Sequence, residues 1–122
     1  MQVHHHLIVR AQINNNRTVE EVNDWLEHLI TVIGMNILHG PVSLYCDKTG
    51  NAGITSFAII DTSHIVLHTW DEKSPSMLQL DVYSCAEFKV EDVIWALGFF
   101  EPVHIDYKFL DMTENFIKIQ AP

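Results

Sequence analysis

The chain has 122 residues and a formal net charge of −9, from 7 basic and 16 acidic residues, with 8 histidines counted as neutral. A domain of this length can bury a single core, and the acidic balance argues against a nucleic-acid partner, which would require a basic surface. No apolar run approaches the roughly 20 residues that cross a bilayer, so no membrane span is expected. Because no basic stretch precedes an apolar one at the N-terminus, the two cysteines are expected as free thiols in the cytoplasm.

Hydrophobic periodicity divides the chain into strands and two helices. In order, the predicted elements are a strand over residues 3–13, a helix over 19–33, strands over 37–45, 54–62, 64–70 and 77–85, a helix over 89–100 and a strand over 103–110. The histidine run at 4–6 falls inside the first strand and is interpreted as part of it. No element is expected after residue 110.

The first helix carries both a start and a stop signal. Thr18 followed by Glu21 matches the capping-box pattern, and Gly34 is the expected C-cap. The order of one strand, a helix, four strands, a helix and a last strand predicts an α+β fold. We expect a single domain over residues 1–122, a two-layer sandwich in which a largely antiparallel sheet packs both helices on one face.

Alternation gathers polar side chains on one face of two central strands. Side chains point to opposite faces in turn, so Ile65 and Leu67 share one face of their strand, while His64 and His68 share the other. The strand over 77–85 divides in the same way. If the apolar faces meet the helices, the opposite face collects His64, His68, Asp81, Tyr83 and Cys85. Such a face is either solvated surface or a functional site.

His64 and His68 do not have the spacing of a metal site if they lie on a strand. Four strand residues span about 13 Å, whereas zinc–nitrogen bonds are roughly 2 Å long. Both imidazoles therefore cannot reach one ion from a straight strand, and no metal is predicted.

Ser63 and His68 are likewise too far apart on one strand to act together as a nucleophile and its general base. They are about 16 Å apart in an extended segment, whereas a general base must lie within roughly 3 Å of the proton it removes. A second copy of the chain, packed face to face, would bring His68 of one protomer to Ser63 of the other. This predicts a homodimer with shared sites; the alternative is that neither residue is catalytic.

Three segments of the chain carry a more specific signal: Gly53 to Ser56, Thr62 to Glu72, and Asp81 to Cys85. They resemble the bacterial and archaeal S-adenosylmethionine decarboxylases, whose pattern runs G-V-S-G, then E-S-H-x-x-x-H-T-W-P-E, then D-x-[YF]-T-C-G. The opening strand is also similar to that family's early segment, in which a histidine and a leucine precede further apolar residues.

The resemblance implies a self-processing proenzyme. The hydroxyl of Ser63 would attack the carbonyl of Thr62, and elimination would split the chain into fragments 1–62 and 63–122. The new N-terminus at Ser63 would become a pyruvoyl group, with no pyridoxal phosphate. This ketone would react with the amine of a small cationic substrate and withdraw electrons as CO₂ leaves, the role that pyridoxal phosphate plays elsewhere.

The resemblance also implies roles for four other residues. Thr55 matches a family serine that assists processing, and His68 matches the histidine implicated in proton removal during elimination. Cys85 matches the general acid that returns a proton to the α-carbon of the substrate. Glu72 matches a carboxylate that holds the ribose hydroxyls of the substrate. In the family, residues from two facing sheets form each site, which for short chains implies a homodimer.

Two positions depart from the family pattern. Thr62 replaces the usual glutamate before the cleaved serine, and Thr49 lies nearest the position of an aromatic residue that stacks on adenine. Three functions therefore remain open. They are an S-adenosylmethionine decarboxylase serving spermidine synthesis, a pyruvoyl-dependent decarboxylase of ornithine or arginine, and an unprocessed, inactive homologue that acts as a binding or regulatory subunit.

Overall fold

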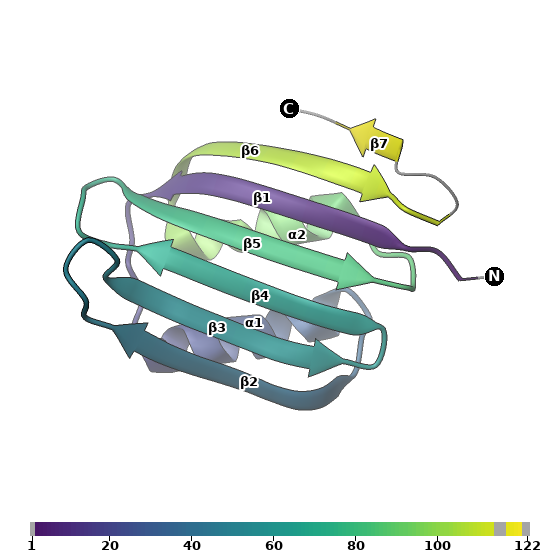
Figure 1. The fold of residues 1–122 in the computed structure, drawn as a ribbon, viewed down its shortest axis with the longest axis horizontal. Coiled ribbons are helices and arrows are strands. Elements are labelled where there is room, and N and C mark those ends of the chain that lie inside the picture. Colours follow the sequence, from purple (N-terminus) through teal and green to yellow (C-terminus); the bar gives the residue numbers. More distant parts are fainter. Residues whose placement is uncertain (1, 114–116, 121–122) are drawn as a thin grey trace.

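The computed structural model describes residues 2–113 and 117–120, which form one sheet and two α-helices (Figure 1). The strands are β1 (His5–Ile13), β2 (Ile37–Cys46), β3 (Gly53–Ile60), β4 (Ser63–Trp70), β5 (Ser76–Ser84), β6 (Pro102–Asp111) and β7 (Ile117–Gln120). The helices are α1 (Val19–Val32) and α2 (Val90–Ala96), and a short 3₁₀ helix, η1 (Leu97–Phe100), continues α2.

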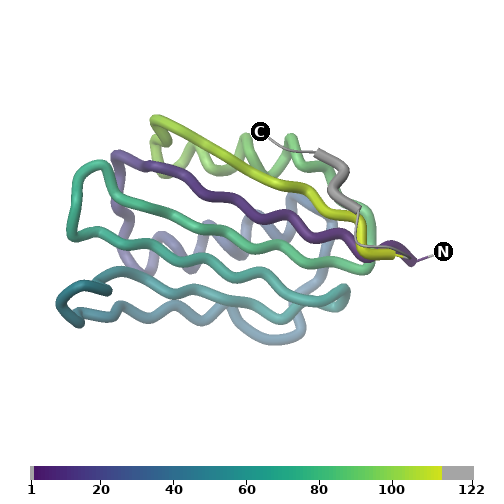
Figure 2. The backbone as a smooth tube through the Cα atoms, turned by 45° about the horizontal axis from the view of Figure 1, so that its top comes forward, coloured from purple at the N-terminus to yellow at the C-terminus, as the bar shows by residue number. Residues whose placement is uncertain are grey.

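The sheet has the strand order β2-β3-β4-β5-β1-β6-β7, so the N-terminal strand lies inside it, between β5 and β6. Every neighbouring pair is antiparallel. Both helices cover the same face, with α1 behind β2 to β4 and α2 behind β1 and β6 (Figure 1). The layer of strands and the layer of helices are also distinct in Figure 2. The predicted two-layer α+β sandwich is confirmed.

Alternation along the strands separates the core from the face turned away from the helices, which we call the open face. In β1 the odd-numbered residues from Leu7 to Ile13 are buried, while the even-numbered residues from Ile8 to Gln12 are exposed. The buried residues of β4 and β5 alternate in the same way, as predicted. The largest fully buried side chains are Phe100, Leu7, Ile13, Leu26, Leu29, Ile30, Ile60, Ile65, Leu67, Leu78, Leu80 and Leu97.

Helix α1 begins at the predicted capping box. The Glu21 amide donates to Thr18 Oγ1 at 3.1 Å, and the Thr18 amide donates to the Glu21 carboxylate at 2.9 Å. These bonds satisfy two amides that have no partner inside the helix. The C-cap is Ile33 instead of the predicted Gly34. Gly34 follows with φ of +78°, a left-handed conformation that suits glycine and ends the helix.

Two other expectations about the elements need correction. The predicted strands over 54–62 and 64–70 are separated by a two-residue turn, because β3 ends at Ile60 and β4 begins at Ser63. Asp61 and Thr62 therefore lie in a turn and not in a strand. The chain also forms β7 after residue 110, where no element was expected, and this short strand pairs with β6.

The structure also answers the questions of a membrane span and of the state of the cysteines. No α-helix in the described part of the chain is long and apolar enough to cross a bilayer. Both cysteines are free thiols, with Cys46 exposed and Cys85 half-buried.

Gly53, the first residue of β3, lies so close to the backbone of β4 that a side chain at this position would not fit. A Cβ added at Gly53 would overlap the carbonyl group of Thr69, whereas one added at Gly98 would have no atom within 4 Å. Because backbone cannot move away cheaply, we expect Gly53→Ala to destabilise the fold by about 4 kcal/mol or more, and Gly98→Ala to change stability by less than about 0.5 kcal/mol. Urea unfolding of both variants measures the difference. Equal stabilities would contradict the close approach.

Candidate active site

Of the five polar residues expected on one face of β4 and β5, His64, His68, Asp81 and Tyr83 lie on the open face, and β3 adds Thr55 to them. Cys85 follows the end of β5 and is not part of the strand. Thr55 pairs with His68 across the β3–β4 ladder, and Thr55 Oγ1 lies 3.0 Å from His68 Nδ1. Within the described residues, His68 Nε2 has no hydrogen-bond partner. The hydroxyl thus orients the imidazole and leaves its second nitrogen available for proton transfer.

A second polar cluster lies further along the same face, around Asp81. His6 Nε2 lies 2.5 Å and His64 Nε2 3.9 Å from the same oxygen of Asp81. The Tyr83 ring lies between them, with ring centroids 5.3 Å from His6 and 5.7 Å from His64. His64, Asp81 and Tyr83 were expected on this face, whereas His6 was not. No group of three or more potential metal ligands is arranged around one point in the described parts of the chain.

The predicted scission point lies at the turn between β3 and β4. Hydrogen bonds from Ser84, the last residue of β5, and from Cys85, which follows it, hold this turn in place. The amide of Cys85 donates to the carbonyl oxygen of Thr62 at 2.8 Å. The hydroxyl of Ser84 donates to Thr62 Oγ1 at 3.0 Å. The carbonyl that the resemblance marks for attack therefore already accepts a backbone hydrogen bond, and Cys85 is the residue that supplies it.

Ser63 has an unusual backbone conformation. Its φ is +147°, a region that side-chain-bearing residues seldom adopt. Such a conformation costs on the order of 1–3 kcal/mol and persists only where the surrounding structure enforces it. The Ser63 hydroxyl makes no hydrogen bond within the described residues. A free hydroxyl therefore follows directly after the hydrogen-bonded carbonyl of Thr62, on strained backbone.

Ser63 and His68 do not meet within one chain. They lie five positions apart on β4, whose pairing with β3 and β5 runs without a bulge. The separation is therefore about 16 Å, as expected from the rise of a strand. The candidate residues form two groups in one protomer, Thr62, Ser63 and Cys85 at one end of β4 and Thr55 and His68 nearer the other.

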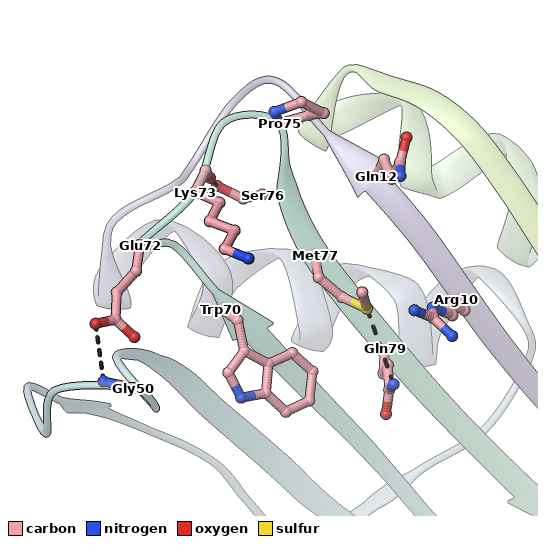
Figure 3. Close-up of a pocket in the computed structure, with 10 residues that line it drawn as sticks. All are labelled: Arg10, Gln12, Gly50, Trp70, Glu72, Lys73, Pro75, Ser76, Met77 and Gln79. Carbon is pink, nitrogen blue, oxygen red and sulfur yellow. Dashed lines mark hydrogen bonds between the residues drawn. The ribbon is translucent and has the colours of Figure 1, made fainter.

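A pocket of the open face lies at the far end of β4, beside Trp70 (Figure 3). Its volume is about 500 Å³. It is lined by Arg10, Gln12, Gly50, Trp70, Glu72, Lys73, Pro75, Ser76, Met77 and Gln79. Of these, only Glu72 was expected at a site from the sequence, and Thr49 does not line this pocket.

Glu72 fastens the loop before β3 to the end of β4. Its carboxylate accepts hydrogen bonds from the amides of Gly50, at 2.9 Å, and Ala52, at 3.2 Å. These two bonds lower the pKa of Glu72 below its ordinary value. Trp70 supports the same loop, because its indole nitrogen donates to Asn51 Oδ1 at 2.9 Å. The carboxylate expected to bind ribose thus already has two backbone partners.

The model of the S-adenosylmethionine decarboxylase family matches residues 6–111. The chain belongs to this family. Among solved structures, the adenosylmethionine decarboxylase from Aquifex aeolicus is similar in fold, with a TM-score of 0.67 over 99% of this chain and 98% of that chain, at 18% sequence identity.

The S-adenosylmethionine decarboxylase match includes every candidate site residue. Thr55, Thr62, Ser63, His68, Glu72 and Cys85 all lie inside residues 6–111. Sequence reasoning missed His6, Arg10 and Lys73. His6 and Arg10 share the even-numbered positions of β1, so alternation would have placed both on the open face had β1 been known to lie beside β5.

The role of the Glu72 carboxylate in holding the loop before β3 can be tested through its two hydrogen bonds. Because its pKa is lowered by the hydrogen bonds, the attachment is complete above the ordinary carboxyl pKa and is lost as pH falls through the lowered value. At neutral pH we expect Glu72→Gln to speed hydrogen exchange of the Gly50 and Ala52 amides several-fold, since a neutral amide accepts more weakly than a carboxylate. Glu20→Gln, on the exposed surface of α1, is the control. Unchanged protection at Gly50 and Ala52 would contradict this role.

Proposed function

We propose that this chain is a self-processing, pyruvoyl-dependent decarboxylase of S-adenosylmethionine that supplies spermidine synthesis. The observation that carries the proposal is the hydrogen bond from the Cys85 amide to the Thr62 carbonyl, 2.8 Å long, directly before a serine with a free hydroxyl. Family membership supports the same reaction.

The residues at the turn fit the chemistry that would make the pyruvoyl group. Attack of Ser63 Oγ on the Thr62 carbonyl carbon moves negative charge onto the carbonyl oxygen. A fixed amide donor at this oxygen stabilises that charge, and one such donor is typically worth about 10²–10³ in rate. The Cys85 amide has the required position. Relief of the backbone strain at Ser63 favours the same step.

Proton transfer at Ser63 needs a base, and His68 of a second protomer is the candidate. Two sheets packed through their open faces, around a two-fold axis near the middle of β4, would place His68 and Thr55 of one protomer against Ser63 of its partner. Strand alternation assigns Ser63 to the helix side, but the φ of +147° departs from strand geometry, so alternation does not fix the direction of its hydroxyl.

The open face has the apolar surface that such a homodimer requires. Ile8, Leu44 and Ile59 project from it with exposed fractions of 43%, 69% and 46%, and Phe57 and Val66 lie half-buried on β3 and β4. Exposed apolar side chains gathered on one sheet face favour association with another apolar surface. Burying them would also exclude water from the shared sites, which strengthens the electrostatic interactions within them.

Once formed, the pyruvoyl group supplies an electron-withdrawing ketone for decarboxylation. Cys85 is half-buried and its amide contacts Thr62 at the proposed scission point, so its thiol is the candidate that would return a proton to the substrate α-carbon. Trp70 offers an aromatic surface in the pocket at the other end of β4. Glu72 keeps unused lone pairs on its carboxylate and can accept hydrogen bonds from ribose hydroxyls as well as from the loop.

Denaturing mass analysis of the purified protein tests the proposal. We expect two fragments, residues 1–62 and 63–122, with the second beginning in a pyruvoyl group. Ser63→Ala should remain a single chain, because it lacks the nucleophile. Ser74→Ala, in the exposed β4–β5 loop, is the control and should be cleaved. A wild-type chain that stays whole after long incubation would exclude self-processing and leave the unprocessed homologue as the function.

A substitution at Cys85 separates the role of its backbone amide from that of its thiol. Cys85→Ala keeps the amide that contacts Thr62 and removes the thiol, so we expect normal cleavage with decarboxylation of S-adenosylmethionine slowed by about 10²-fold or more. Cys46→Ala, at the other free thiol, is the matched control. Release of labelled CO₂ measures the rate. If Cys85→Ala turns over as fast as the wild type, another group donates the proton.

A further inference from the structure

Two cations that form no ion pair within the described residues line the pocket beside Trp70, in a chain that has few cations. The protein has 7 lysines and arginines against 16 acidic residues, yet both Arg10 and Lys73 line this one pocket. Figure 3 shows Lys73 reaching into it from the β4–β5 loop, while Arg10 projects from β1 on the far side of Met77. Within the described residues, neither side chain forms an ion pair or hydrogen bond.

Within the described residues, the nearby acidic groups contact other partners and form no ion pair with these cations. Glu72 accepts two hydrogen bonds from the loop amides, and Asp81 contacts His6. Asp106, which lies opposite Arg10 in the β1–β6 register, instead contacts His104 Nε2 at 2.9 Å. By contrast, the guanidinium of Arg17, outside the pocket, has partners within the protein. It donates to the Phe99 carbonyl and pairs with Glu21. Because Glu72 lines the same pocket, two positive charges there face one carboxylate, and the lining carries a net charge of about +1 toward whatever enters it.

We propose that Arg10 and Lys73 determine the charge specificity of this pocket, excluding amino acids with a cationic side-chain end and admitting a substrate whose distal end is neutral. This inference rests on the proposed function, in that the pocket receives the end of the substrate remote from the reacting amine. Ornithine and arginine carry an ammonium or a guanidinium at that end. S-adenosylmethionine carries its positive charge on the sulfonium in the middle of the molecule, and the adenosyl group at that end is uncharged.

The rest of the lining suits a neutral, flat group. Trp70 and Met77 supply apolar contact, and the amides of Gln12 and Gln79 supply hydrogen-bond donors and acceptors without charge. A cationic end would instead meet two like charges in the lining, offset there by the single carboxylate of Glu72. Because the pocket is only partly enclosed by protein, this repulsion should be sensitive to ionic strength.

Binding measurements with three probes test the inference. The probes are 5′-methylthioadenosine, which is neutral, and L-ornithine and L-arginine, which have cationic ends. Calorimetric titrations use the purified protein and are repeated with Ser63→Ala, in which no turnover can consume an amine. We expect the wild type to bind methylthioadenosine and to bind the two amino acids at least about tenfold more weakly, a difference of about 1.4 kcal/mol.

The double variant Arg10→Gln, Lys73→Gln should bind ornithine and arginine about tenfold more tightly than the wild type, with the affinity for methylthioadenosine changed less than about threefold. High salt should shrink that gain, because it already screens the repulsion in the wild type. The matched control is Lys89→Gln, Lys108→Gln, which removes two exposed positive charges outside the pocket and should leave all three affinities unchanged.

Several outcomes would overturn the inference. They are no gain of ornithine or arginine binding in the double variant, an equal gain in the control, or no binding of any probe to any form of the protein. Failure of the proposed function is distinguishable, because it appears as absence of chain cleavage. Charge selectivity measured in Ser63→Ala does not depend on cleavage, and cleavage does not depend on the charges of Arg10 and Lys73.

Discussion

The extended geometry of β4 is the constraint on which the site depends. The strand is paired without a bulge to β3 on one side and β5 on the other, so its residues advance by about 3.3 Å each and cannot fold back. Ser63 begins the strand and Trp70 ends it. One protomer therefore holds the proposed scission point and the pocket at opposite ends of the same strand, and the proposed site requires a second copy to bring the two together.

Backbone amides hold both ends of this arrangement. At the proposed scission point the Cys85 amide contacts the Thr62 carbonyl, and at the pocket the amides of Gly50 and Ala52 contact the Glu72 carboxylate. Sheet pairing fixes the Cys85 amide beside the turn, so replacing that side chain leaves the donor in position. This explains how Thr62 can replace the glutamate usual in the family: the proposed cleavage uses the carbonyl of this residue and does not require its side chain.

Much of the fold and part of the site could be predicted because their signals are local. Alternation in β4 placed His64 and His68 on the open face, and the capping box marked the start of α1. The turn at Asp61 and Thr62 was missed because the residues around it continue the apolar pattern of the strands. The contact of His6 with Asp81 joins residues 75 positions apart, and it depends on β1 lying beside β5. Local periodicity does not encode which strands become neighbours, so Arg10 and its pocket could not be predicted either.

The claim that each site is shared between protomers can be tested most directly by co-expressing Ser63→Ala and His68→Ala chains that carry different tags. Each variant alone should remain whole, since one lacks the nucleophile and the other the base. In mixed dimers the His68→Ala chain keeps Ser63 and meets an intact His68 on its partner. The account predicts that mass analysis finds cleaved His68→Ala chains and whole Ser63→Ala chains. If both remain whole although mixed dimers form, the shared site is contradicted.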